Sequence, residues 1–71
     1  MSTQTFKVEG MTCDHCVHAV TEELQQLDGV SDVGVELVPG GISHVTVDSE
    51  REVADAEVAA ALDEAGAYAL A

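Results

Sequence analysis

The hydrophobic repeat changes its period several times along this chain, and the order of those changes limits the fold more than any other feature. In three segments apolar residues alternate with polar ones, which is typical of half-buried strands. In two others they recur every three or four positions, as on one face of an amphipathic helix, and a short apolar segment near the end suits a last strand. In chain order the segments are residues 3–9, 15–27, 33–38, 45–47, 55–65 and 67–70. The sequence therefore predicts the order strand, helix, strand, strand, helix, strand.

Turn-forming residues separate these segments. Asp28 and Gly29 should end the first helix, since glycine is common just past a helix end. The Pro-Gly-Gly run at residues 39–41 should join the second and third strands in a hairpin. Asp55 is placed to cap the second helix, and Gly66 to end it. The resulting order is that of an α+β ferredoxin-like βαββαβ sandwich, a four-stranded antiparallel sheet with two helices on one face.

Composition narrows the choice of function. The 71 residues suffice for one domain, residues 1–71, with no room for a second catalytic lobe, and we expect the protein not to be an enzyme. Against 14 acidic residues stand only Lys7 and Arg51, which gives a net charge of −12 and argues against binding to nucleic acid or to an anionic membrane. No apolar run is long enough for membrane insertion, and residues 1–10 lack a secretory signal pattern. We therefore expect a cytoplasmic location.

The chemistry of the chain is concentrated in residues 10–16, Gly-Met-Thr-Cys-Asp-His-Cys, between the first strand and the first helix. Cys13 should lie in the loop and Cys16 in the opening helical turn, where the positive end of the helix dipole favours thiolates. Two soft thiolates suit Cu(I), which needs no further ligand, whereas zinc prefers four. The same spacing also serves thiol–disulfide exchange. A thiol–disulfide oxidoreductase and a carrier of zinc, cadmium or mercury therefore remain alternatives.

The Gly-Met-Thr-Cys-x-x-Cys motif, its place between strand and helix, and the Asp-Glu-Ala-Gly end of the second helix resemble the heavy-metal-associated domain family. A chain of this length looks like a free-standing bacterial copper chaperone of that family. The resemblance implies that Cys13 and Cys16 carry Cu(I) and pass it to the metal-binding domain of a copper-transporting P-type ATPase. It also implies that Met11 lies beneath the loop as an apolar tether and not as a ligand. The family's aromatic residue beside the metal loop is represented by Tyr68, one position later than usual.

Three histidines remain to be placed. His15, between the cysteines, is either a polar loop residue or a group that tunes the thiols or ligates a second copper in a copper-linked homodimer. His18 is two residues past Cys16 and should point away from it, because positions i and i+2 of a helix do not share a face. His44 is out of phase with the apolar positions of its strand, so we expect it on the surface.

Overall fold

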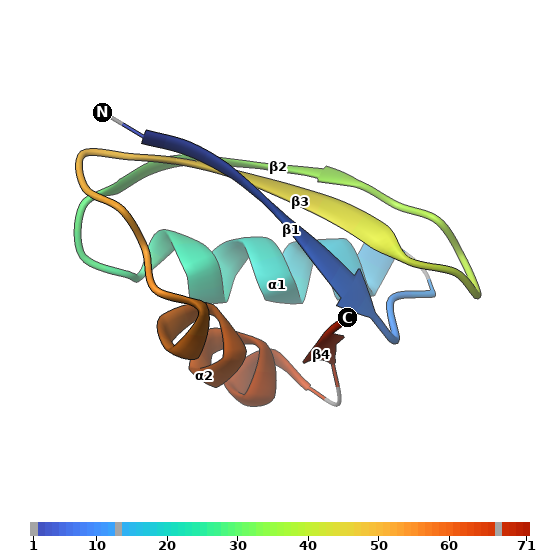
Figure 1. Cartoon of the computed structure of the whole chain (residues 1–71). Helices are drawn as coiled ribbons and strands as arrows, with labels where there is room; N and C mark the ends of the chain where they lie inside the picture. The colour runs from blue at the N-terminus through green and yellow to red at the C-terminus, as the bar shows by residue number, and fades with distance from the viewer. Residues whose placement is uncertain (1, 13, 67) are drawn as a thin grey trace.

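The chain folds into two layers, an antiparallel sheet and two helices that both cover one of its faces (Figure 1). The computed structural model describes residues 2–12, 14–66 and 68–71. In chain order the elements are β1 (Ser2–Glu9), α1 (Asp14–Gln25), β2 (Val30–Glu36), β3 (Ser43–Ser49), α2 (Asp55–Ala65) and β4 (Ala69–Leu70). The strands lie in the order β2-β3-β1-β4, and each neighbouring pair is antiparallel. The predicted ferredoxin-like sandwich is confirmed.

The inner face of the sheet and the facing sides of the helices form the hydrophobic core. Its members with 0% exposure are Val8, Met11, Val20, Leu24, Val45, Val47, Val58 and Leu62. The outer face of the sheet carries the alternate, polar positions, where Lys7 lies opposite His44. His44 is half-exposed there, as its phase predicted. Among the described residues, no helix is both long and apolar enough to span a membrane.

The first helix is shorter than its hydrophobic repeat. α1 ends at Gln25, whereas the repeat predicted a helix as far as Leu27. The amide of Leu27 donates to the carbonyl of Leu24 at 3.1 Å, three residues back, so the last turn is tighter than an α-helical one. Gly29 then adopts a φ of 83°, a left-handed conformation that favours glycine, and the chain reverses into β2.

The second and third strands are also shifted from their predicted bounds. β2 covers Val30–Glu36 instead of residues 33–38, and β3 covers Ser43–Ser49. Past the end of β2, the amide of Val38 donates to the hydroxyl of the buried Ser43 at 3.0 Å. This side-chain hydrogen bond replaces a strand-to-strand bond, so residue 38 belongs to the hairpin turn.

The second helix is capped differently from the prediction. Asp55 is its first residue, and the N-cap position belongs to Ala54. Alanine offers no side-chain acceptor; instead its own amide donates to the Glu57 carboxylate at 3.3 Å. Arg51 holds the same carboxylate through two bonds, Nη1 to Oε1 at 2.9 Å and Nη2 to Oε2 at 2.6 Å. The hydrogen bonds from Arg51, and then that from Ala54, lower the pKa of Glu57 to about 2.

A single side chain fastens β1 to the connection that precedes α2. The amide group of Gln4 donates to the carbonyl of Val53 at 3.0 Å and accepts from the amide of Val53 at 2.7 Å. Gln4 thus makes the two hydrogen bonds to Val53 that a residue of a neighbouring strand would make. These bonds satisfy both backbone groups of Val53, which is buried. No local pattern in the sequence indicates this contact.

Candidate metal centre

The loop that carries the cysteine motif leaves the sheet beside the β2–β3 hairpin. The last residues of β1 set this position, because Val8 pairs with Ser43 at the start of β3. Gly10 then has a φ of 95°, which other residues rarely adopt, and this turns the chain out of the sheet toward α1 (Figure 1). The motif glycine is therefore required by the backbone.

Met11 anchors the loop from below. Its side chain is 0% exposed and belongs to the core cluster. The flexible, polarizable thioether suits an irregular core position of this kind. The buried position that the family resemblance implies for Met11 is confirmed. Gly10, the residue before it, is exposed, so the loop is anchored in the hydrophobic interior at its start.

Cys16 lies in the first turn of α1, where it is half-buried and packs against the core. The hydroxyl oxygen of Thr12 lies 3.8 Å from its sulfur. The first-turn amides of a helix have no partner within the helix, and they stabilise a negatively charged sulfur together with the helix dipole. The sequence prediction for this residue agrees with its position. Cys13, the other predicted ligand, lies outside the described residues.

The histidines of α1 are both on the surface. His15 and His18 are exposed, so the surface position predicted for His18 is confirmed. Exposure of His15 agrees with its reading as a polar residue, while its action on the thiols or on a second copper stays a prediction. Within residues 2–12, 14–66 and 68–71, no three or more His, Cys, Asp and Glu side chains are grouped so as to hold a metal ion.

Tyr68 packs on the end of the second helix. It is half-buried against the core, and a Cβ atom added at Gly66 would lie 2.9 Å from Cε2 of its ring. Gly66 is therefore needed for close approach of the ring, in addition to its predicted role in ending α2. Sequence reasoning missed this contact, although a glycine two positions before an aromatic residue could have suggested it. The approach of Tyr68 to the metal loop stays a prediction.

The surface around these elements is acidic. Of the two cationic side chains in the sequence, Arg51 is engaged by Glu57, and this ion pair raises the pKa of the guanidinium further. The acids Asp14 and Glu22 of α1 are exposed. The field of the molecule therefore attracts positively charged partners.

A βαββαβ sandwich with a cysteine in the opening turn of its first helix and a buried methionine just before it defines a class of small metal-carrier domains. The chain belongs to the heavy-metal-associated domain family, whose sequence profile matches residues 5–67. This membership makes the chain a metal carrier and not an enzyme.

Relatives and a solved structure agree with this assignment. The chain is 41% identical over 66 residues to the copper chaperone CopZ of Bacillus subtilis (strain 168), a match that covers 93% of each chain. It is 55% identical over 42 residues to the copper chaperone CopZ of Staphylococcus saprophyticus, which covers 59% of this chain and 62% of that relative's length. A solved structure of a CopZ metallochaperone superposes with a TM-score of 0.81 at 32% identity, over 99% of this chain and 100% of the other.

Proposed function

We propose that residues 1–71 form one domain that binds Cu(I) through Cys13 and Cys16 and delivers it to the metal-binding domain of a copper-transporting P-type ATPase in the cytoplasm. The observation that carries the proposal is the position of Cys16, half-buried in the first turn of α1 with Met11 beneath the loop. The relatives named as copper chaperones support copper as the cargo. Soft thiolates are also the ligands that Cu(I) prefers.

Transfer by such a site is ligand exchange without oxidation or reduction. A thiolate of the partner attacks the two-coordinate copper and forms a three-coordinate intermediate, and one of the carrier's own sulfurs then leaves. A second exchange moves the ion completely. The first-turn amides of α1 stabilise the departing thiolate, since its negative charge returns as copper leaves. Docking of this kind is small and transient.

The test is an anaerobic Cu(I) titration against a competing chelator, combined with X-ray absorption to count sulfur ligands. Cys13→Ser and Cys16→Ser should each lower the affinity by more than about 100-fold, because each removes half of the ligand set. His18→Ala is the matched control, since His18 is exposed on the same helix and should leave the affinity unchanged. Near-native affinity in either serine variant would exclude the two-sulfur site. A preference for zinc over copper would identify another cargo.

A copper-linked homodimer gives a different spectrum. It would add a copper–copper vector to the absorption data and raise the molecular mass measured by sedimentation. With the monomeric carrier we expect neither change. Mixing the loaded protein with a purified metal-binding domain of a copper-transporting ATPase then tests delivery. Copper transfer should be complete before size-exclusion chromatography separates the two proteins.

A further inference from the structure

One edge of the sheet is mostly uncovered. β1 pairs with β3 from Ser2 to Val8, but on its other side, among the residues that the structure describes, β4 pairs only with Val8 and Glu9. Exposed strand edges present rows of main-chain donors and acceptors that can pair with another chain. Here the uncovered stretch of β1 is residues 3–6, continuous with the end of β4.

The hydrogen bond to β4 shows which backbone groups point outward. The amide of Ala71 donates to the carbonyl of Lys7 at 2.9 Å, so Lys7 directs its backbone groups toward the β4 side. In an antiparallel ladder, alternate residues direct both backbone groups to the same side. The N–H and C=O groups of Thr3 and Thr5 therefore face the uncovered edge.

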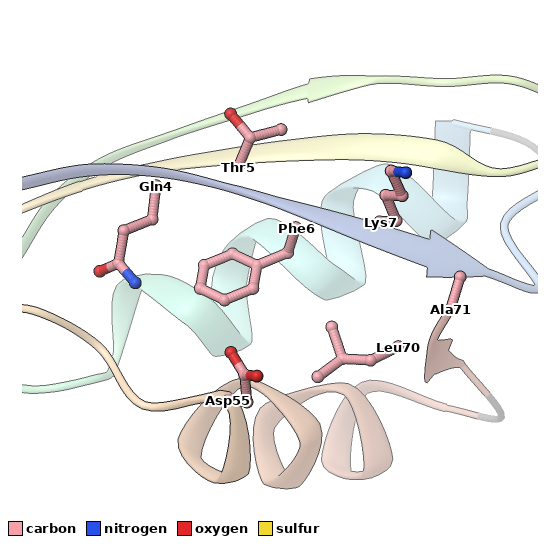
Figure 2. A pocket seen from close by; sticks show the side chains of 7 residues that line it. All are labelled: Gln4, Thr5, Phe6, Lys7, Asp55, Leu70 and Ala71. Atoms are coloured by element: carbon pink, nitrogen blue, oxygen red, sulfur yellow. The ribbon is translucent and has the colours of Figure 1, made fainter.

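A groove of about 500 Å³ lies along this edge, between β1 and α2. Figure 2 shows Phe6 and Leu70 on its apolar floor, with Asp55 at the start of α2 pointing toward β1. Gln4 also points to this inner side, while Thr5 and Lys7 point to the other side of the strand. A strand laid along β1 would thus place every second side chain in the groove.

The charge of the groove and of the chain selects the occupant. The side chain that faces inward opposite Phe6 meets Phe6 and Leu70, which favours an apolar residue. The next inward side chain, opposite Gln4, lies beside the amide that binds Val53, in the part of the groove that Asp55 also lines, which favours a cation. A second copy of this chain suits the site poorly, because it would bring together two molecules that each carry a net charge of −12.

From this geometry we infer that the uncovered edge of β1 is a peptide-binding site that takes an extended, basic segment of another protein by strand addition. Main-chain bonds to Thr3 and Thr5 provide the binding, and the groove reads the alternate side chains. The inference is independent of the metal site, which lies on the loop beyond the other end of β1. A negative peptide titration would therefore leave the proposed copper transfer unaffected, and a negative copper titration would leave the proposed peptide site unaffected.

The probe is a capped pentapeptide, valine-threonine-lysine-threonine-valine, whose antiparallel addition to β1 places its first valine opposite Phe6 and its lysine opposite Gln4, clear of Ala71. It is titrated into ¹⁵N-labelled apo-protein under reducing conditions. We expect saturable shifts of the Thr3 and Thr5 amides and hydrogen exchange at these amides slowed by about tenfold at saturation. A control peptide of the same sequence, N-methylated on the threonine opposite Thr5, keeps its charge but cannot pair, and it should not bind. Equal binding of both peptides would overturn the proposal.

Two variants test the charge contribution. Asp55→Lys should weaken binding by about three- to fivefold, the upper part of the range for a solvent-exposed ion pair, because it also places a second cation beside the peptide lysine. Asp63→Lys, at an exposed position of the same helix outside the groove lining, is the matched control and should change binding by less than about twofold. Equal effects of both variants would overturn the groove as the binding site. Concentration-dependent shifts of Thr3 and Thr5 without peptide would also overturn the proposal, since the occupant would then be a second copy.

Discussion

Replacement of Met11 separates the two roles that a sulfur-containing residue could have beside a copper loop. The side chain is 0% exposed within the core cluster, so Met11→Ala should leave a cavity under the loop. Such substitutions of buried methionine cost about 2–5 kcal/mol. A domain of this size is stabilised by roughly 4–10 kcal/mol in total, so the variant should lose a large part of its stability. Met11→Leu keeps the volume and should cost less than about 1.5 kcal/mol.

Copper affinity should respond differently. If Met11 acts only by packing, Met11→Leu removes the sulfur but not the support, and its Cu(I) affinity should equal that of the parent chain. Met11→Ala should bind more weakly by a modest factor, because the loop loses its fixed position before copper arrives.

Two measurements decide the matter. Urea unfolding of the apo-protein under reducing conditions gives the free energies of unfolding, and competition with a Cu(I) chelator gives the affinities. A loss of affinity in Met11→Leu by about tenfold or more, equal to about 1.4 kcal/mol, would place the thioether among the ligands and refute the packing role. A stability change below about 1 kcal/mol in Met11→Ala would refute the burial argument itself.

Three further predictions concern the rest of the molecule. Gln4→Met should lower the free energy of unfolding by about 2 kcal/mol and the Tm by roughly 8–16 °C, because two hydrogen bonds to Val53 are lost. The control, Gln25→Met on the exposed side of α1, should change the free energy of unfolding by less than about 0.5 kcal/mol. The pKa of Glu57 is lowered from an ordinary 4.5 to about 2, so its pairing with Arg51 stabilises the fold above about pH 4.5. This stabilisation is lost as the pH falls toward 2. Glu57→Gln should therefore flatten that part of the stability profile measured by urea unfolding. Copper transfer to a basic partner domain should slow with rising salt through its association rate while Cu(I) affinity is unchanged, and a stopped-flow rate that stays flat would contradict steering by the acidic surface.

The order of elements could be predicted because each depends on residues near it in the chain. Alternation and helical repeat identify the strands and helices, and the Pro-Gly-Gly run marks the hairpin. Their ends depend on distant residues and could not be read in the same way. β2 begins at Val30 because that residue pairs with Ser49 at the far end of β3.

The predicted cap at Asp55 failed for a related reason. Its side chain was suitable, but the carbonyl of Ala54 already accepts from the amides of Glu57 and Val58 at 3.0 and 3.2 Å, so the helix begins one residue earlier than predicted. The Glu57 carboxylate, which Arg51 holds from six residues away, binds the amide of Ala54 at this earlier start. The contact of Gln4 with Val53 joins residues 49 positions apart, and no local pattern marks it. Contacts between polar side chains and distant backbone thus set the limits of what the sequence shows.

At the candidate site, the helical position of Cys16 could be predicted because a motif and a helix start coincide there. The same arrangement explains how a carrier can both hold and release its cargo. Below the loop, Met11 is buried and limits the movement of the motif, which favours binding by keeping the loop in place before copper arrives. On the other side of the loop, Thr12 and His15 are exposed and polar, so in the proposed transfer a partner's thiolate would meet polar side chains there. Substitutions in the buried floor should therefore alter affinity and stability, whereas those on the exposed rim should alter the transfer rate.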